Sequence, residues 1–549
     1  MSLDAVDREL IWNGLTAVAQ EMAIVEYRSS FSPVIREMLD YSCSVLDAEG
    51  RLLADAATIP AQVGTVEFAL AGVLERLGPL DEGDVVLMND PYHGATHLPD
   101  IEIFMPVHHR GRLLGYTVTV AHHVDVGGSA PHNRGTIPGQ SEASLDIIEE
   151  GLLFPATKLY SRGVRNEAVW ELILANVRDP DMSTGDFGAQ VSACVRGVER
   201  MGELADRFGY DAVREAMAEL VEDTSRRTKA VLDSWPTREV TAIGRLDGDG
   251  LNFREPVEIV VRLRVVDGVV EVDLSDSAAQ VPGPTNIPWA STHAAVYYGV
   301  KCFLRQDLRQ NHGYMRHIRL TAPEGLVVRP RRPAAVDTRH LGVQLLSDIV
   351  FRALGDLLPD LAVASSHVSF PMLHVRAYDE RLGRHRTMLD MVGGGGGARP
   401  GGVGESGIDS YTSNCAQLPA EVVELDYPWR IVRTELVGGS GGAGRWEGGL
   451  GIRREYELLG ERAFGLIQAE QQLPASGASG ASGGGRGAPA AILIRRAGST
   501  QWTDIGHEYN SLSFSRGDVL AIVAAGGGGY GPPDEAAGGA NPSVRQAVS

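Results

Sequence analysis

The chain has 549 residues, a hydrophobic content of 43% and a formal net charge of −21 at pH 7. This length predicts two or three packed units, because a single small core does not grow to that size. The acidic balance argues against a nucleic-acid-binding protein, which needs a basic surface, and it is typical of a soluble cytosolic protein.

The cysteines and the N-terminus also indicate the cytoplasm. The four cysteines are widely spaced and form no C-x-x-C pair, which excludes a zinc finger or redox motif of that type and suits a reducing compartment. The first ten residues are acidic and lack the apolar core of a signal peptide. No run reaches the ~20 apolar residues of a membrane span. We therefore expect a cytoplasmic protein with no membrane contact.

Apolar spacing near the N-terminus predicts two helices around a pair of strands. Residues 6–29 and 63–77 repeat apolar side chains at helical intervals. Between them, residues 42–46 and 51–54 are expected to be strands joined by a turn. Asp40 precedes the first of these strands, where a carboxylate is typical of a turn or a cap.

Histidines gather in the next stretch. Residues 89–128 read NDPYHGATHLPDIEIFMPVHHRGRLLGYTVTVAHHVDVGG and contain six of the 15 histidines of the chain. The apolar runs 101–107 and 113–120 predict two strands, and the Arg110-Gly111 pair predicts a hairpin turn between them. Such a hairpin brings two polar clusters side by side at one end; these are residues 96–100 and residues 121–125.

Both clusters offer the ligands that divalent metals take in proteins, because each contains imidazole and carboxylate groups. On spacing alone, a metal site and a set of histidines that cap loops are equally supported. Asn89 and Asp90 follow a short predicted strand, residues 84–88. There they either fix the imidazoles from outside the ligand set or form an Asx turn that only shapes the loop.

Helical periodicity returns after the histidine-rich stretch. Residues 167–177 and 187–235 carry apolar stripes, and Tyr210-Asp211 is expected to supply a turn and an N-cap within the second range. This helical layer is best explained as scaffold and subunit contact.

Beyond Pro236 the apolar pattern changes to alternation. Residues 257–265 alternate at period two and lead into a predicted hairpin turn at Asp267-Gly268, and residues 292–304 and 341–357 are expected to be buried helices. We therefore predict an α+β fold. Its expected parts are a metal-bearing N-terminal domain with a helical layer at 1–235, a β-rich, glycine-rich C-terminal domain at 236–533, and a disordered tail at 534–549.

Three glycine runs mark the last third of the chain, at residues 393–400, 438–456 and 526–533. They either cradle an anion with backbone amides or allow tight turns and close strand packing. The sequence contains no Gly-Lys pair, which excludes a Walker A loop. Ser440 fits a G-x-S-x-G pattern but lacks the strand-to-helix elbow of a serine nucleophile.

The segment NDPYHGATHLPDIEIFMPV, followed by AHHVDVGG, closely resembles the hydantoinase B family, and EEGLLFPATKLY and SDSAAQVPGPTN extend the likeness over nearly the whole chain. That family includes the B subunits of ATP-dependent hydantoinases, the C-terminal half of 5-oxoprolinase, and one subunit of acetone and acetophenone carboxylases. The resemblance implies metal ligands at His97, Asp100 and His122, with a further carboxylate at Asp40. Zinc, manganese and iron all accept this ligand set.

The resemblance implies a B-type subunit of an ATP-dependent cyclic amide hydrolase, of the hydantoinase, oxoprolinase or lactamase type. A separate A-type subunit is expected to bind ATP and phosphorylate the substrate, which agrees with the missing Walker loop. The metal is expected to lower the pKa of bound water from ~15.7 toward ~7 or to polarise the carbonyl. His123 and Asp125, within three residues of His122, are the nearest candidates for a general base.

Two other functions stay open at this point. One is a subunit of an acetone- or acetophenone-carboxylase-like enzyme, and the other is a non-catalytic scaffold for the ATP-binding subunit. Chain length favours the hydrolase over the carboxylase. The sequence leaves open which ring or ketone is the substrate, which metal is bound, and whether the active centre is shared with the partner.

Overall fold

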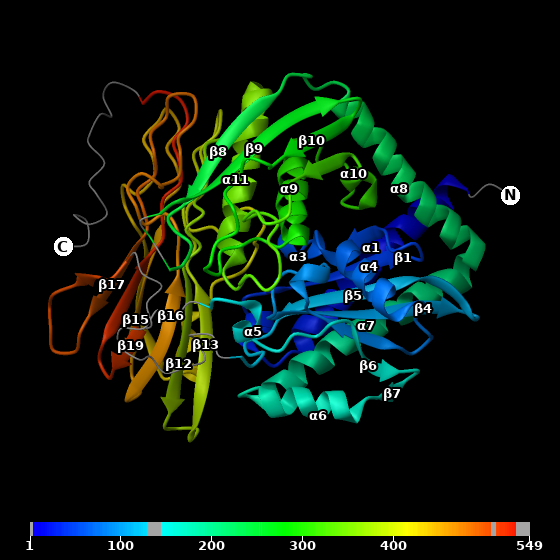
Figure 1. The fold of residues 1–549 in the computed structure, drawn as a ribbon, viewed down its shortest axis with the longest axis horizontal. Coiled ribbons are helices and arrows are strands. Elements are labelled where there is room, and N and C mark those ends of the chain that lie inside the picture. Colours follow the sequence, from blue (N-terminus) through cyan, green and yellow to red (C-terminus); the bar gives the residue numbers. More distant parts are fainter. Residues whose placement is uncertain (1–3, 129–143, 252, 254, 507–511, 534–549) are drawn as a thin grey trace.

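The computed structural model describes residues 4–128, 144–251, 253, 255–506 and 512–533. Four sheets with helices packed against them form the described chain (Figure 1). Paired strands in these sheets run antiparallel, with the parallel pair β10 and β11 as the exception within the described ranges. The α+β prediction is therefore confirmed. The tail predicted to be disordered, 534–549, lies outside the described residues.

The first sheet carries the predicted metal ligands. Its seven strands follow the order β2 (Leu52–Asp55), β1 (Tyr41–Asp47), β5 (Arg112–His122), β4 (Asp100–His109), β3 (Val85–Met88), β6 (Thr157–Ser161) and β7 (Val164–Arg165). One face of this sheet, which includes Ile101 and Ile103 of β4, is covered by α7 (Pro180–Phe208) on β4 and β5 and by α1 (Ala5–Ser29) on β1 and β2. The opposite face, with Phe104 and the β5 residue Val120, belongs to the core that continues into the rest of the chain.

The other three sheets come from the second half of the chain. The second sheet has the order β11 (Ile318–Thr321), β10 (Val269–Asp273), β9 (Val257–Val266) and β8 (Val240–Leu246). The third has the order β13 (Arg384–Met391), β12 (Met372–Asp379), β16 (Arg462–Gln468) and β19 (Leu512–Ser515). The fourth has the order β14 (Trp429–Leu436), β15 (Ile452–Leu458), β20 (Val519–Val523), β17 (Ala491–Arg495) and β18 (Thr503–Asp504).

Two long helices, α9 (Trp289–Phe303) and α11 (Arg339–Leu357), pack on each other, and α11 also packs on β8 and β9. The remaining helices are α2 (Pro33–Arg36), α3 (Pro60–Val63), α4 (Val66–Leu77), η1 (Pro91–His93), α5 (Ile147–Glu150), α6 (Glu167–Asn176), α8 (Tyr210–Leu232), α10 (His312–Met315), η3 (Pro359–Leu361) and α12 (Ala420–Asp426). Each helix of the described chain is too short or too polar to span a bilayer.

The predicted helical layer exists, but its internal break differs from the prediction. Residues 187–208 belong to α7 and residues 210–232 form α8, and α7 begins earlier, at Pro180, behind an Asp179 cap. Gly209, with φ of 90°, separates the two helices and is the N-cap residue of α8, with no side-chain cap bond. The prediction of a turn at Tyr210-Asp211 was therefore wrong, because the break between the helices lies at Gly209. Glycine adopts the positive φ that this position needs without strain.

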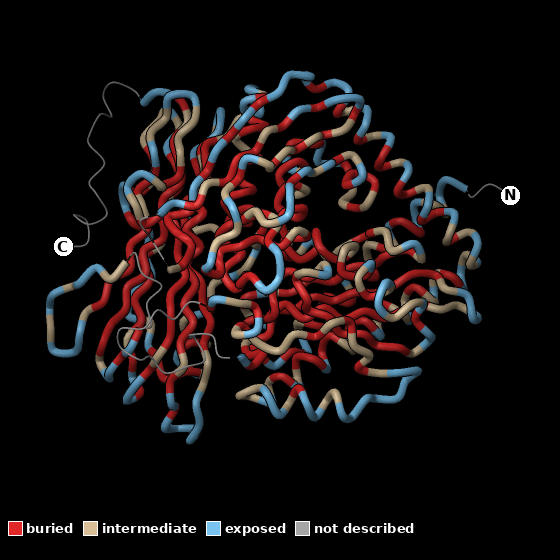
Figure 2. The backbone as a smooth tube through the Cα atoms, in the orientation of Figure 1, coloured by how far each residue is buried: buried red, intermediate tan, exposed pale blue. Residues whose placement is uncertain are grey.

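One apolar core crosses the predicted domain boundary. It joins the α4 residues Leu70 and Val73 to Leu346 of α11 and to Trp429 of β14, and Figure 2 shows buried backbone throughout the interior strands. The end of α8 and the start of β8 flank Pro236. The division into 1–235 and 236–533 stays a prediction.

The glycine runs pack backbone against backbone. A Cβ atom added to Gly527 would lie 1.9 Å from the carbonyl oxygen of Gly396, and one added to Gly449 would lie 1.8 Å from that of Glu405. The Gly449 amide donates to Gly396 at 2.8 Å, and the Gly527 amide donates to Gly449 at 3.0 Å. Close strand packing therefore accounts for glycine at these positions.

Candidate metal centre

The predicted hairpin is present. Strands β4 and β5 pair in antiparallel register, with Asp100 opposite His122 at the open end. Arg110 and Gly111 join them with φ angles of 53° and 76°, the left-handed pair that a two-residue hairpin turn of type I′ requires. The hairpin therefore fixes the two polar clusters side by side, as their spacing predicts.

Three of the predicted ligands converge on one point. His97 Nε2 lies 3.3 Å from His122 Nδ1, and Asp100 Oδ1 lies 3.2 Å from the same His122 nitrogen. His97 Nε2 lies 3.5 Å from Asp100 Oδ2. A tight turn in which the Asp100 amide donates to the His97 carbonyl brings these two residues together. All three side chains are buried.

Asp40 approaches the cluster from the loop between α2 and β1. Its carbonyl oxygen accepts the His122 amide at 3.1 Å, and its Oδ2 lies 3.9 Å from His122 Nδ1. Gln62 of α3 spans the two carboxylates, because its Nε2 donates to Asp40 at 2.9 Å and lies 3.4 Å from Asp100 Oδ1. The fourth predicted ligand therefore lies at the edge of the cluster.

These distances fit a metal ion. Around a tetrahedral metal with bonds of ~2.0–2.1 Å, neighbouring ligand atoms lie roughly 3.3–3.4 Å apart. The two imidazole nitrogens lie 3.3 Å apart, and each lies 3.2–3.5 Å from one of the two carboxylate oxygens of Asp100, Oδ1 for His122 and Oδ2 for His97. With one atom taken from each residue, all three ligand atoms lie within 4.8 Å of one another. His97 Nδ1 lies 3.3 Å from the Asp337 carbonyl oxygen, so this nitrogen carries the proton and Nε2 presents its lone pair to the cluster. The donor set and its spacing therefore suit zinc, manganese or iron.

The cluster is strongly coupled electrostatically. Burial alone would raise the pKa of Asp100, yet the imidazoles of His97 and His122 and the guanidinium of Arg339 hold that pKa well below its usual range. Burial lowers the pKa of His97, whereas the hydrogen bond to Asp100 raises the pKa of His122 despite burial. Burial raises the pKa of Asp40 to about 6. A deprotonated Asp100 beside a neutral His97 is the protonation state that a metal needs.

Arg339 is the cation that balances Asp100 in this structure. Its Nη2 donates to Asp100 Oδ2 at 2.7 Å, and both side chains are almost completely buried. Thr96 donates to the same carboxylate oxygen at 2.5 Å. Asp100 thus has a positive partner that any bound divalent cation would join or replace.

A cavity of about 50 Å³ opens beside the cluster. His97, Asp100, His122 and Asp40 line one side, and the first two turns of α11 line another. The apolar part of the wall includes Met372. This volume exceeds the roughly 10–15 Å³ that a cavity needs to hold one water, so there is space for a small ligand beside the cluster.

His123 and Asp125 lie elsewhere. Side chains alternate along β5, so His122 faces the cavity while His123 faces α7, where its Nε2 lies 3.0 Å from Gln190 Oε1. Asp125 accepts from Arg178 Nη1 at 2.9 Å. Both residues line a separate cavity of about 20 Å³. Their role as a general base stays a prediction.

Asn89 and Asp90 order the loop that carries His97. The Asn89 side chain donates to the carbonyls of Leu98 and Leu152 at 2.8 and 2.9 Å. Asp90 accepts from the Tyr92 amide at 3.0 Å and lies 2.9 Å from His93 Nδ1. These contacts brace the backbone next to His97, while direct support of the imidazoles by either residue stays a prediction.

Comparison with known proteins identifies the family. The family model described as hydantoinase B/oxoprolinase matches residues 4–533. The chain belongs to the hydantoinase B/oxoprolinase family. A relative from Pseudomonas sp. (strain NS671) is provisionally named as the B component of a D-/L-hydantoinase. It is 32% identical to this chain, and the match covers 84% of this chain and 80% of the relative.

Solved structures of two other proteins have the same fold as this hydantoinase B/oxoprolinase family member. The crystal structure of an ATP-dependent caprolactamase from Pseudomonas jessenii is 26% identical, covers 98% of this chain and 93% of its own, and superposes with a TM-score of 0.88. Nucleotide-free acetone carboxylase covers 96% of this chain and 76% of its own with a TM-score of 0.87, and at 16% identity this likeness concerns the fold alone.

Several residues that line the cavity were not predicted from the sequence. Gln62, Arg339, His340 and Gln344 all line the cavity beside the predicted metal ligands. Arg339 lies 239 positions from Asp100 in sequence. Arg339 and His340 just precede a predicted buried helix, and the only local signal was this pair of polar residues at the start of an apolar run.

Proposed function

We propose that this chain is the B-type subunit of an ATP-dependent cyclic amide hydrolase of the hydantoinase, oxoprolinase or lactamase type. One observation carries the proposal. Two imidazoles and a carboxylate, from the β4–β5 hairpin and the loop that precedes it, have their ligand atoms within 4.8 Å of one another, with Asp40 beside them. The family membership and the relatives named as a hydantoinase B component and a caprolactamase support the choice of reaction.

The proposed reaction needs two kinds of activation: phosphorylation of the amide oxygen and Lewis-acid chemistry from the metal. An amide carbon in a small unstrained ring is a poor electrophile, and phosphorylation of its oxygen by an A-type partner makes it attackable. A divalent metal held by His97, Asp100 and His122, with Asp40, supplies Lewis-acid chemistry that acidifies water or polarises a carbonyl. In this proposal ATP acts at the partner, and the two polypeptides form a hetero-oligomer.

The residues of this chain prepare the site before any substrate binds. Asp100 stays ionised because two imidazoles and Arg339 surround it. Gln62 donates to Asp40 and approaches Asp100, which holds the two carboxylates in place on one side of the cluster. The Asp337 carbonyl fixes the ring of His97. These contacts preorganise the ligand set, so that metal binding requires little reorganisation.

The test uses the purified complex with its A-type partner. We expect ATP-dependent ring opening of at least one of hydantoin, 5-oxoproline and ε-caprolactam, and His97→Ala should abolish it without affecting subunit association. His93→Ala is the matched control, because His93 lies in the same loop but is largely exposed and pairs with Asp90. Turnover that persists in His97→Ala would refute the metal-assisted mechanism.

Two further outcomes separate the alternatives. Incorporation of labelled bicarbonate into a ketone, with no ring opening, would identify a carboxylase-like enzyme. Loss of subunit association in His97→Ala, with a normal metal content, would favour a scaffold. Metal analysis of the isolated chain, expected to give close to one divalent ion, is therefore measured on every variant.

A further inference from the structure

The first two turns of α11 present buried polar atoms to the cavity without a partner. His340 and Gln344 line the cavity and are 8% and 2% exposed. Both ring nitrogens of His340 lack a hydrogen-bond partner among the described residues, and so does Oε1 of Gln344. Gln62 Oε1 and Arg339 Nε, from residues that line the same cavity, also lack a hydrogen-bond partner among the described residues.

Such a concentration of unpaired groups indicates a ligand. More than nine in ten buried polar groups in folded proteins have a partner, so several around one small cavity call for a partner that the described protein atoms do not supply. Residues 340 and 344 lie one helical turn apart, which places their side chains on the same face of α11. The fold thus holds two hydrogen-bonding side chains in line beside the predicted metal ligands, and among the described residues no partner pairs with the His340 ring nitrogens or Gln344 Oε1.

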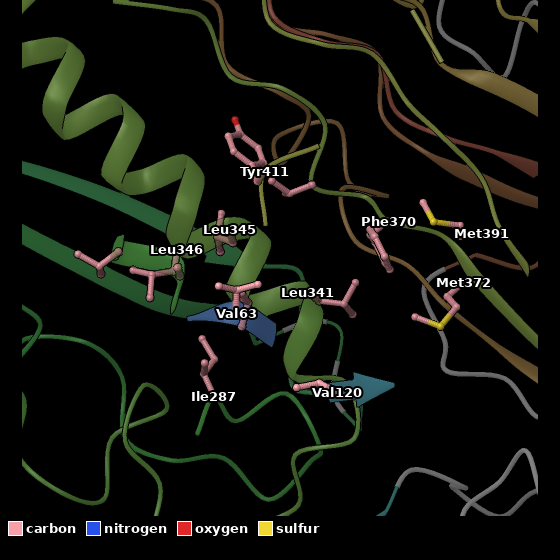
Figure 3. Close-up of a cluster of buried hydrophobic side chains, with 14 of the residues drawn as sticks. Val63, Val120, Ile287, Leu341, Leu345, Leu346, Phe370, Met372, Met391 and Tyr411 are labelled. Atoms are coloured by element: carbon pink, nitrogen blue, oxygen red, sulfur yellow. The ribbon is translucent and has the colours of Figure 1, made fainter. Parts of the chain in front are cut away.

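The opposite wall is apolar. Phe370 and Met372 line the cavity, and the Phe370 ring lies 5.1 Å from that of His340 at an angle of 54°. Figure 3 shows both residues beside Leu341 at the N-terminal end of α11. A molecule that fits both walls has an apolar body and one group that accepts and donates hydrogen bonds. Met372 is unbranched and flexible, so this wall can yield to a ring larger than the cavity of about 50 Å³.

We propose that His340 and Gln344 bind the amide group of the cyclic substrate and select rings that keep an N–H. In the parent ring, before its oxygen is phosphorylated and its N–H proton is lost, Gln344 Oε1 accepts from the ring N–H and the His340 imidazole donates to the exocyclic oxygen. This inference rests on the proposed function and adds the residues that recognise the amide group of the substrate. Burial, with Arg339 close by, keeps the pKa of His340 well below its usual range, so the ring is neutral and offers one donor and one acceptor.

Binding is measured on the full metal-loaded chain without ATP or partner, so a failure here is separate from a failure of the turnover assay. Saturation-transfer NMR is recorded with ε-caprolactam, 2-pyrrolidinone, hydantoin and N-methyl-2-pyrrolidinone. We expect the parent rings to bind, and 2-pyrrolidinone to bind about tenfold more tightly than its N-methyl analogue. Gln344→Met should remove this tenfold preference, and His340→Phe should weaken all parent rings about tenfold.

Stability distinguishes a binding role from a structural one. Because both ring nitrogens of His340 and Oε1 of Gln344 lack partners among the described residues, His340→Phe and Gln344→Met should leave the melting temperature of the ring-free chain unchanged or higher, with normal metal content. His293→Phe is the control, since His293 of α9 is buried but its Nδ1 lies 3.0 Å from a Trp289 carbonyl and it does not line the cavity. It should not alter ring binding. No binding of any parent ring, an intact N–H preference in Gln344→Met, or a lowered melting temperature in both α11 variants would overturn the inference.

Discussion

Removal of Arg339 should destabilise the metal-free chain far more than the metal-loaded chain. In the structure Arg339 Nη2 lies 2.7 Å from Asp100 Oδ2, and both side chains are almost completely buried. Arg339→Met leaves the Asp100 carboxylate without its guanidinium. Losing one partner of a buried ion pair costs about 3–5 kcal/mol, because the remaining charge is uncompensated. A divalent cation on Asp100 supplies the missing positive charge, so the cost should largely vanish when metal is bound.

The expected shift follows from the size of the chain. At ~2.1 cal/mol/K per residue over 549 residues, the unfolding entropy is about 1.2 kcal/mol/K, so 3–5 kcal/mol lowers the melting temperature by about 3–4 °C. Differential scanning calorimetry of EDTA-treated and metal-saturated protein measures both cases. We expect a drop of about 3–4 °C without metal and less than about 1 °C with it, from the same entropy relation.

A second pair on the same helix provides the control. Arg352 Nε lies 2.9 Å from Asp348 Oδ2, away from the metal ligands. Arg352→Met should lower the melting temperature equally in both conditions, because no cation replaces its charge. Equal shifts for Arg339→Met with and without metal would refute the reasoning, since Asp100 would then not be a ligand.

Two further predictions concern pH and glycine packing. Burial raises the Asp40 pKa from 3.8 to about 6, so its contribution to stability is complete below about pH 4 and is lost as the pH rises through 6. In EDTA, Asp40→Asn should therefore be more stable than wild type at pH 7.5 and match it near pH 4, as measured by urea unfolding; a constant difference would contradict the assignment. Gly527→Ala should lower the melting temperature markedly, because its Cβ would meet the Gly396 carbonyl, whereas Gly438→Ala meets nothing within 4 Å and should be nearly neutral. Equal melting temperatures would contradict the packing explanation.

The convergence of His97, Asp100 and His122 was predictable because its determinants are local. Alternating apolar residues and the Arg110-Gly111 turn fix the β4–β5 hairpin, and the hairpin alone brings Asp100 opposite His122. The direction of His123 was also available from the strand period, because neighbouring side chains point to opposite faces. His123 therefore lines a different cavity from His122, and its role as a general base stays a prediction.

The rest of the site depends on contacts that no local pattern encodes. Asp40 reaches the cluster through a loop whose carboxylate looks like a cap, and the family resemblance, not its spacing, named it. Arg339, His340 and Gln344 arrive on α11 because that helix packs on β8, β9 and α9. Apolar periodicity predicted the helix from residue 341 onward, but it carries no information on which sheet the helix's first turn will face.

The most direct test of the account is an anomalous-difference map from a crystal of the metal-loaded chain, recorded at the absorption edge of the bound metal. We expect one dominant peak roughly 2.0–2.2 Å from His97 Nε2, His122 Nδ1 and an Asp100 carboxylate oxygen. A dominant peak bound by other residues, or no peak between these three side chains in protein that analysis shows to contain metal, would contradict it.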